Sequence, residues 1–203
     1  MNSKKAILQF KSLKKLVKDK NMRLAAEWDE DWKILIATIL SAVTRDEVTI
    51  VVCEELFEKY PSMEKLSRAR LSSVEKIIKH VNFYKNKSKN IIATTKILKD
   101  GKIPKSVNEL ITLPGVGRKV ANVYLVGAHN AHAIGVDTHV ARISFKLDWT
   151  DSKNAHIVEK DLEKLFPKKY WCEINDVLVR FGKSYGLSRK KEDEILAKIR
   201  PLN

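Results

Sequence analysis

Residues 108–142, NELITLPGVGRKVANVYLVGAHNAHAIGVDTHVAR, form the stretch that decides the fold we expect for this chain. The pattern indicates a short helix, a tight glycine turn, a longer helix, and a loop that leads into a third helix. We expect Pro114 to end the first helix, because proline cannot continue the helical hydrogen bonding. The apolar side of that helix would consist of Leu110, Ile111 and Leu113.

The turn between the first two helices contains Gly115 and Gly117 on either side of Val116. Glycine allows positive φ and a close approach of the backbone to another surface. The second helix is expected to begin near Gly117, where its first N–H groups would present a partial positive charge to a phosphate. Arg118 and Lys119 add formal charge there. The alternative interpretation is an ordinary αα-hairpin with glycine at a helix end.

Two motifs together are much more specific than the glycines alone: LPGVGRKVAN at 113–122 and VDTHVAR at 136–142. They resemble the helix–hairpin–helix and the following aspartate of the endonuclease III family of DNA repair glycosylases. The resemblance extends over almost the whole chain, as far as position 187, and is strongest at 110–142. It implies an enzyme that excises oxidised pyrimidines from duplex DNA and then nicks the strand.

Lys119 and Asp137 are the candidate catalytic residues. A lysine amine is a nucleophile only when neutral, and nearby positive charge, here from Arg118 and a helix N-terminus, favours the neutral form. The amine would attack the sugar C1′, displace the base and form a Schiff base, from which the 3′ phosphate is eliminated. Asp137 would assist proton transfers or stabilise positive charge on the sugar. The simpler interpretations are a surface lysine that contacts phosphate and an aspartate that caps the next helix.

Charge and composition indicate the class of partner. Lysines and arginines number 39 against 25 acids, a net charge of +14 that suits DNA because neutralised phosphates release counterions. A merely basic protein, or a thermophile with a lysine- and glutamate-rich surface, is the alternative. No apolar run is long enough for a transmembrane helix, and the N-terminus lacks the apolar core of a signal peptide. We expect a cytoplasmic, nucleoid-associated monomer that binds DNA and no membrane.

Helical periodicity dominates the chain, and no stretch alternates with period two for long, so we predict an all-α fold. The expected helices outside the hairpin are 3–19, 31–42, 46–59, 62–69, 71–80, 87–99, 138–147, 154–165, 169–182 and 188–199.

The resemblance adds a domain organisation that periodicity cannot supply. It implies a six-helix domain at 23–132 that carries the hairpin and Lys119. A second helical domain, formed by 1–22 plus 133–203, would carry Asp137. The active site would then lie in the cleft between the two domains.

Two loops are candidates to fill the gap that a flipped nucleotide leaves in a duplex. The first, LSAVTRDEVT at 40–49, is similar to the family's LSAQTTD segment and offers Ser41 as a DNA contact. Val43 stands where the family usually has a glutamine that meets the orphaned base. Valine cannot hydrogen-bond, so it would fill space without reading that base, or else it packs against the helix end. Asp46 would cap the helix that follows.

The second loop, HVNFYKNKSKNII at 80–92, resembles the family's GFYxxKA loop. Phe83 and Tyr84 would intercalate or stack on bases. In the alternative, Phe83 lies in the core and the nearby lysines are solvated. Asn82 replaces a glycine of the family, and asparagine tolerates the left-handed conformation expected there. The lysines expected to contact phosphates are Lys85, Lys87 and Lys89.

The DTHVAR motif contains His139 and Arg142, and the resemblance implies backbone contacts beside the flipped nucleotide for this segment. Arg142 has two candidate partners, a phosphate or an acid from a neighbouring helix. We expect Ser188 to cap the last helix. That helix would set Lys190 and Lys191 against Glu192, Asp193 and Glu194. The basic residues that would either contact DNA or form solvated surface are Lys183, Arg189, Lys190 and Lys191.

Most members of the resembled family carry a [4Fe–4S] cluster on four cysteines near the C-terminus. This chain has only Cys53 and Cys172, so we expect neither a cysteine-ligated cluster nor a disulfide framework. The resemblance also implies a candidate site for a monovalent cation in the hairpin, at the carbonyls of Ile111, Leu113 and Val116.

The leading hypothesis is a DNA glycosylase and abasic-site lyase whose partner is duplex DNA with damaged bases or abasic sites. One alternative is a glycosylase for mispaired thymine or uracil, although relatives that only remove the base generally lack a lysine at position 119. Another is a helix–hairpin–helix DNA-binding protein without chemistry. Such a module would have no use for a lysine and an aspartate at this spacing.

Overall fold

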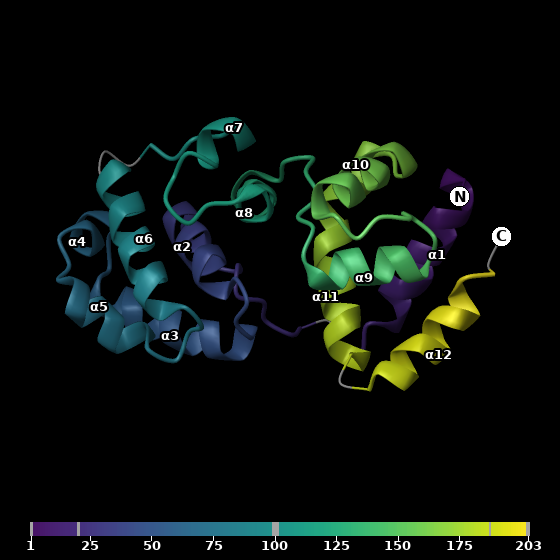
Figure 1. Cartoon of the computed structure of the whole chain (residues 1–203), viewed down its shortest axis with the longest axis horizontal. Coiled ribbons are helices and arrows are strands. Elements are labelled where there is room, and N and C mark those ends of the chain that lie inside the picture. Colours follow the sequence, from purple (N-terminus) through teal and green to yellow (C-terminus); the bar gives the residue numbers. More distant parts are fainter. Residues whose placement is uncertain (1, 20, 99–101, 187, 202–203) are drawn as a thin grey trace. The chain divides into compact units, whose positions relative to one another are not determined.

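The computed structural model describes residues 2–19, 21–98, 102–186 and 188–201, and helices are the only regular secondary structure in these ranges. The predicted all-α fold is therefore confirmed. The chain divides into two compact units, Arg23–Asn130 and Met1–Met22 with Ala131–Asn203 (Figure 1). Among the described residues no helix is long and apolar enough to cross a membrane.

Helix α2 is the centre of the unit Arg23–Asn130. Its sequence is apolar nearly all round, and it packs against α3, α6 and α8. The resemblance predicts six helices here. The described residues form one more, because the hairpin contributes the single turn α7 as well as α8. The helices are α2 (Asp31–Ser41), α3 (Asp46–Lys59), α4 (Met63–Ser67), α5 (Leu71–Ile78), α6 (Tyr84–Ile97), α7 (Val107–Leu110) and α8 (Arg118–His129).

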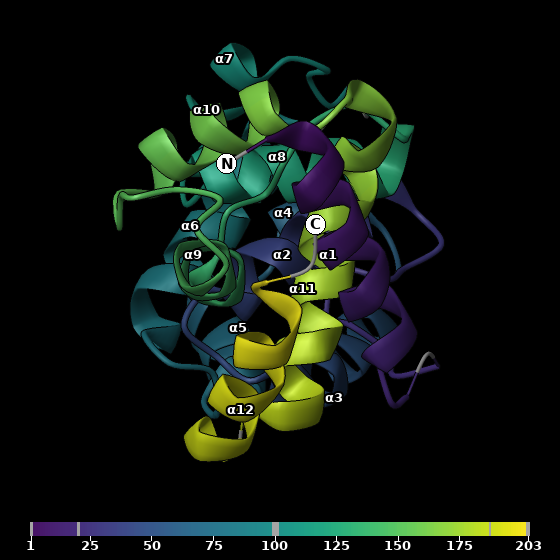
Figure 2. The same ribbon diagram turned by 90° about the vertical axis from the view of Figure 1, so that its right-hand side faces the viewer.

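Helix α11 organises the other unit. It packs against α1, α9 and α12, and both views show α12 alongside it (Figures 1 and 2). The core beside it contains edge-to-face aromatic pairs, with the rings of Phe10 and Phe166 5.9 Å apart and those of Trp149 and Phe166 4.9 Å apart. The helices are α1 (Ser3–Leu16), α9 (Thr138–Lys146), α10 (Ala155–Leu165), the 3₁₀ turn η1 (Lys168–Tyr170), α11 (Trp171–Tyr185) and α12 (Arg189–Ile199).

Several helix boundaries differ from the prediction by a few residues, and two of the differences have clear local causes. Helix α6 begins at Tyr84, because the carbonyl of Phe83 already accepts the first helical hydrogen bonds. The predicted end of that helix, Lys99, lies outside the described residues. Helix α7 ends at Leu110, so the prediction that Pro114 ends it is wrong. The N–H groups of Thr112 and Leu113 bond three residues back, which tightens the chain into a turn before the proline.

A buried glutamine joins segments from both ends of the sequence within the second unit. Gln9 on α1 is completely buried. Its Oε1 accepts from the indole N–H of Trp149 at 2.6 Å, and its Nε2 donates to the carbonyl of Arg200 at 2.9 Å. A buried polar group is stable only when its partners are present. This side chain therefore ties α1 to the chain after α9 and to the end of α12.

We expect Gln9→Leu to lower the free energy of unfolding by about 2 kcal/mol, because it leaves the buried Trp149 N–H without an acceptor and removes the hydrogen bond to the Arg200 carbonyl. Urea denaturation measures this. The exposed neighbour Lys11→Gln on the same helix serves as the control and should change stability by no more than about 0.5 kcal/mol. Equal stability of the two variants would show that the Gln9 hydrogen bonds do not stabilise this unit.

Candidate active site

Gly115 is required by both conformation and packing. Its φ is +78°, and a Cβ there would lie 3.0 Å from the Cβ of Asn90 and 3.2 Å from Ile39. The hydroxyl of Thr94 donates to the carbonyl of Pro114 at 2.8 Å, which anchors the turn to α6. Gly117 is different: its φ is −90°, so the expected positive φ holds for Gly115 only.

Gly117 is the N-cap of α8, which confirms where the second helix of the hairpin begins. A Cβ at Gly117 would meet nothing within 4 Å, so neither its conformation nor packing within the chain requires a glycine. Arg118 and Lys119 are the first residues of α8 and are half-buried. Val116 is a buried side chain, so only its main chain is available for a surface contact.

Asp137 is the N-cap of α9. Its Oδ1 accepts the N–H of Val140 at 2.8 Å, which confirms the predicted cap. The N-terminus of a helix also favours negative charge. The half-buried carboxylate is thus held in one orientation beside a favourable dipole. These properties serve stability, and they are also what a catalytic carboxylate needs.

Val43 and Phe83 are exposed apolar residues in the left-handed conformation, with φ of 56° and 58°. Their exposed fractions are 76% and 67%, so neither takes the core position of the alternative interpretations. The left-handed conformation costs roughly 1–2 kcal/mol for a residue other than glycine. Asn82 was expected to adopt it, but Phe83 does so instead, and the side chain of Asn82 donates to the carbonyl of Val43 at 2.5 Å.

Lys87 holds the turn that presents Val43. Its ammonium donates to the carbonyl of Leu40 at 2.8 Å, to the hydroxyl of Thr44 at 3.2 Å and to the carbonyl of Ala42. The side chain is buried. The prediction that Lys87 contacts phosphate is therefore wrong, because its three donors are used inside the protein. Spacing could not reveal this, since the acceptors are two main-chain carbonyls and one hydroxyl on a distant loop.

The charge of Lys87 matters for Lys119. Burial, and then the positive charge of Lys119, lower the pKa of Lys87 to about 8. Its oxygen partners favour the ammonium, so Lys87 is charged at neutral pH. Two nearby positive charges each destabilise the charged form of the other. Lys87 therefore adds to the positive surroundings in which the amine of Lys119 stands.

The other candidate residues of the two loops differ in how far they are exposed. Ser41 is half-buried and donates its hydroxyl to the carbonyl of Thr38 at 2.9 Å. Tyr84 is half-buried as the first residue of α6, and Lys85 and Lys89 are exposed. Asp46 is the first residue of α3, whose N-cap is Arg45, so Asp46 lies in the first turn and is not the cap.

Arg142 pairs with an acid, which settles the choice left open by the sequence. Its Nε and Nη2 donate to the two carboxylate oxygens of Glu192 at 2.9 and 2.8 Å, and Lys146 donates to the same carboxylate at 2.9 Å. Glu192 lies on α12 and is completely buried. Burial alone would raise the pKa of Glu192, but the hydrogen bonds from Arg142 and Lys146 hold it below its ordinary value.

This pairing corrects the expected role of Glu192 as a partner of Lys190 and Lys191. Those two lysines and Arg189 are exposed on the first turn of α12, and Lys183 is half-buried on α11. Ser188 accepts the N–H of Lys191, so the predicted cap of α12 is confirmed.

The two cysteines do not fit a four-thiolate cluster. Cys53 is completely buried on α3 and Cys172 is half-buried on α11, so they belong to different units. Burial raises the pKa of the Cys53 thiol, which disfavours the thiolate that binds metal. Within the described ranges no group of three or more histidine, cysteine or acidic residues is placed to hold a metal ion.

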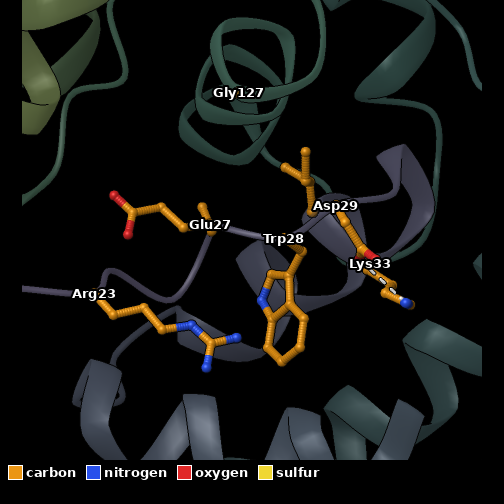
Figure 3. Close-up of a pocket in the computed structure, with 8 residues that line it drawn as sticks. Arg23, Glu27, Trp28, Asp29, Lys33 and Gly127 are labelled. Carbon is orange, nitrogen blue, oxygen red and sulfur yellow. Dashed lines mark hydrogen bonds and ion pairs between the residues drawn. The ribbon is translucent and has the colours of Figure 1, made fainter.

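A surface hollow of about 640 Å³ lies in the unit Arg23–Asn130, between the chain that precedes α2 and the helix α8 (Figure 3). The guanidinium of Arg23 lies over the ring of Trp28, 4.5 Å from its centroid. Gly127 lets α8 approach Ile34, which a Cβ would meet at 3.3 Å. None of the candidate catalytic or DNA-contacting residues lines this hollow.

We expect Lys87→Met to lower the free energy of unfolding by about 2–3 kcal/mol, because it leaves buried carbonyls of the 40–44 turn without a donor. Trypsin should then cleave faster after Arg45, which follows that turn. Lys85→Met makes the same charge change at an exposed site and should alter neither quantity. Unchanged stability and cleavage in Lys87→Met would show that the ammonium does not hold the turn.

Comparison with known proteins places this geometry in a family. Residues 36–168 match the model of the HhH-GPD superfamily base excision DNA repair protein. Endonuclease III of Thermotoga maritima is 38% identical over 157 residues, covering 76% of this chain and 74% of the relative. Endonuclease III of Synechocystis sp. is 39% identical over 162 residues, covering 78% and 74%.

Among solved structures, a trapped endonuclease III–DNA covalent intermediate matches with a TM-score of 0.85 and 32% identity, over 93% of this chain and 90% of that chain. The range that matches the family model contains both Lys119 and Asp137. The chain therefore belongs to the HhH-GPD superfamily of base excision DNA repair proteins, and within it to the endonuclease III family.

Proposed function

We propose that this base excision repair DNA glycosylase and abasic-site lyase removes oxidised pyrimidines from duplex DNA through a Schiff base on Lys119. The observation that carries the proposal is the position of Lys119. It stands in the first turn of α8, next to Arg118 and close enough to the buried Lys87 for their charges to interact. A helix N-terminus and two cationic neighbours all favour the neutral amine, which is the nucleophile.

The chemistry gives Lys119 and Asp137 different roles. The amine of Lys119 attacks C1′ while the bond from C1′ to the base breaks, and the base leaves with the bonding electrons and takes up a proton. Loss of a proton from nitrogen and opening of the sugar ring give the Schiff base. Removal of a C2′ proton then breaks the C3′–O bond, and the 3′ phosphate leaves. Asp137 stabilises the positive charge that develops on the sugar or accepts a proton.

The N-terminus of α8 is suited to hold a DNA phosphate. Its N-cap is a glycine without a side chain, and space for a close approach surrounds that residue. Backbone N–H groups and the helix dipole favour an anion there. Arg118 adds a formal charge, and the net charge of +14 attracts the strand as a whole.

Val43 and Phe83 are suited to fill the space of a flipped nucleotide. Both project apolar side chains into solvent from strained backbone, and strained conformations persist where the surroundings hold them in place. Apolar wedges stabilise a base step that has lost its stacking. Tyr84 would stack beside them, and Lys85 and Lys89 would contact phosphates.

The hairpin cation remains a proposal that concerns main-chain oxygens only. The carbonyl of Leu113 accepts the N–H of Val116 at 3.1 Å, and a carbonyl oxygen has a second lone pair for a cation. The carbonyls of Ile111 and Val116 would complete the contact. Such a cation would stiffen the turn that leads into α8.

Val43 leaves open a second candidate substrate, thymine or uracil in a mismatch. Its side chain cannot hydrogen-bond to an orphaned base, so the protein would not depend on the identity of that base. A panel of duplexes with one oxidised pyrimidine, one mispaired thymine or one uracil distinguishes the two substrate classes by the base released.

Borohydride trapping tests the nucleophile. Incubation with an abasic-site duplex and sodium cyanoborohydride should give a covalent complex with the wild type. Lys119→Gln should reduce trapping on the order of 10³-fold or more, because the attacking amine is gone. Lys105→Gln changes the same charge in the same unit and should trap normally. Strand cleavage without trapping in the wild type would exclude the Schiff base.

Val43→Asn should separate stability from function. Asparagine tolerates the left-handed conformation, so the free energy of unfolding should rise by about 1 kcal/mol. Base release should fall about tenfold, the equivalent of about 1.4 kcal/mol, because a small polar group replaces the apolar wedge. Val51→Asn, at an exposed helical position, should not stabilise the protein and should leave base release unchanged. A Val43→Asn variant with full activity would contradict the wedge.

A further inference from the structure

Glu192 is a completely buried carboxylate that the reaction described above does not use. An ionised carboxylate is costly to bury unless it is paired and hydrogen-bonded. Here both oxygens accept from the guanidinium of Arg142, and one also accepts from Lys146. Glu192 lies on α12, and its two partners lie on α9. The carboxylate therefore fixes the orientation of Arg142 as well as the docking of two helices.

The oriented guanidinium reaches a second residue, His139, on the turn of α9 that follows the Asp137 cap. Nη2 of Arg142 lies 3.2 Å from Nδ1 of His139. This nitrogen carries two hydrogens, so it can donate to Glu192 and to His139 at once. The imidazole also packs directly on α11, where a Cβ at Gly182 would lie 2.1 Å from Nδ1. The absence of a side chain at Gly182 is what admits the ring.

This contact determines the tautomer of His139. A guanidinium has donors and no acceptor, so Nδ1 must be the acceptor of the pair. An imidazole that accepts at Nδ1 is neutral, and it carries its hydrogen on Nε2. Protonation would place an Nδ1–H opposite a cationic donor. His139 therefore presents an N–H donor at Nε2.

We propose that Glu192 is a positioning residue that acts through Arg142 to fix His139 as a neutral Nε2–H donor for a DNA phosphate. The phosphate contact rests on the proposed function. The link from Glu192 to the tautomer does not, since it follows from the three side chains. In the resembled family, this C-terminal segment is where the cluster ligands stand. Here a buried ion pair connects the segment to α9.

The charges around His139 support a neutral ring. Burial is the largest influence and lowers the pKa of His139, and the cations Arg142 and Lys183 act in the same direction. The carboxylates of Asp137 and Glu192 oppose it but do not outweigh it. These groups come from α9 and its cap, from α11 and from α12. Since the folded-state pKa lies below the ordinary value, the neutral ring is favoured at neutral pH.

The tautomer can be measured on the wild-type protein without any substitution. Nitrogen-15 NMR of the imidazole ring should show His139 with hydrogen on Nε2 and none on Nδ1 at pH 7. In Glu192→Gln the guanidinium loses its charged anchor, and a mixture of the two tautomers should appear. An Nδ1–H tautomer or a cationic ring in the wild type, or an unchanged tautomer in folded Glu192→Gln, would overturn the proposal.

Affinity for a duplex with a stable abasic-site analogue tests the consequence for DNA. Glu192→Gln removes a negative charge, so general electrostatics alone would strengthen binding. We expect binding about tenfold weaker, the equivalent of about 1.4 kcal/mol. Glu194→Gln makes the same charge change at an exposed position of α12 and should bind as well as the wild type or better. Equal or stronger binding by folded Glu192→Gln would contradict the positioning role.

A double-mutant cycle separates this role from a general structural one. If Glu192 acts through His139, adding Glu192→Gln to His139→Gln should cause no further loss of affinity, whereas independent effects would add. If Glu192→Gln does not fold, Arg142→Lys is the alternative variant. It keeps the positive charge but loses the planar guanidinium that donates to Glu192 and His139 together, so it should give the same tautomer mixture. Failure of the wild type to bind abasic DNA would refute the proposed function and leave the tautomer result standing.

Discussion

The hydrogen bonds from the buried ammonium of Lys87 are the interactions on which the loop proposed to contact DNA depends. The ammonium gathers acceptors from residues 40–44 and thereby holds Val43 in a conformation that a β-branched residue rarely adopts. Asn82 bonds to the same turn and precedes the left-handed Phe83. The turn that presents Val43 is thus bonded to the residue directly before the second strained apolar residue, Phe83. The same charge acts on Lys119, so a single buried lysine contributes both to the presentation of the proposed wedge residue Val43 and to the electrostatics of the proposed nucleophile.

The N-termini of α8 and α9, which carry the proposed chemistry, are capped in different ways. Helix α9 is capped by its own Asp137, so its end is satisfied within the chain and the carboxylate is held in a fixed orientation. Helix α8 has a glycine at its N-cap, which provides no side chain to bind the first N–H groups. The N-terminus of α9 therefore supplies a carboxylate, whereas the N-terminus of α8 is suited to bind an anion. This difference matches a carboxylate that stabilises positive charge and a lysine that works beside a phosphate.

The sequence predicted the features that depend on local rules. Periodicity gave the helices, the glycines gave the start of α8, and short-range capping gave the roles of Asp137 and Ser188. Prediction from the sequence failed where the environment of a residue depends on a partner far away in the chain. From the sequence, Lys87 could not be told from its exposed neighbour Lys85. Nothing in the loop sequence shows that carbonyl oxygens from residues 40–44 accept hydrogen bonds from the Lys87 ammonium. Glu192 looked like one acid in a solvated run, and its partner Arg142 lies fifty residues earlier in the chain.

The site of attachment in the wild-type complex identifies the nucleophile directly. An abasic duplex is trapped by reduction, the protein is digested, and the modified lysine is located by tandem mass spectrometry. Lys87 is the rival amine in the same unit, with a pKa lowered to about 8. Its donors are engaged by the turn, so the account predicts a single adduct on Lys119. An adduct on Lys87, or one spread over several surface lysines, would contradict it.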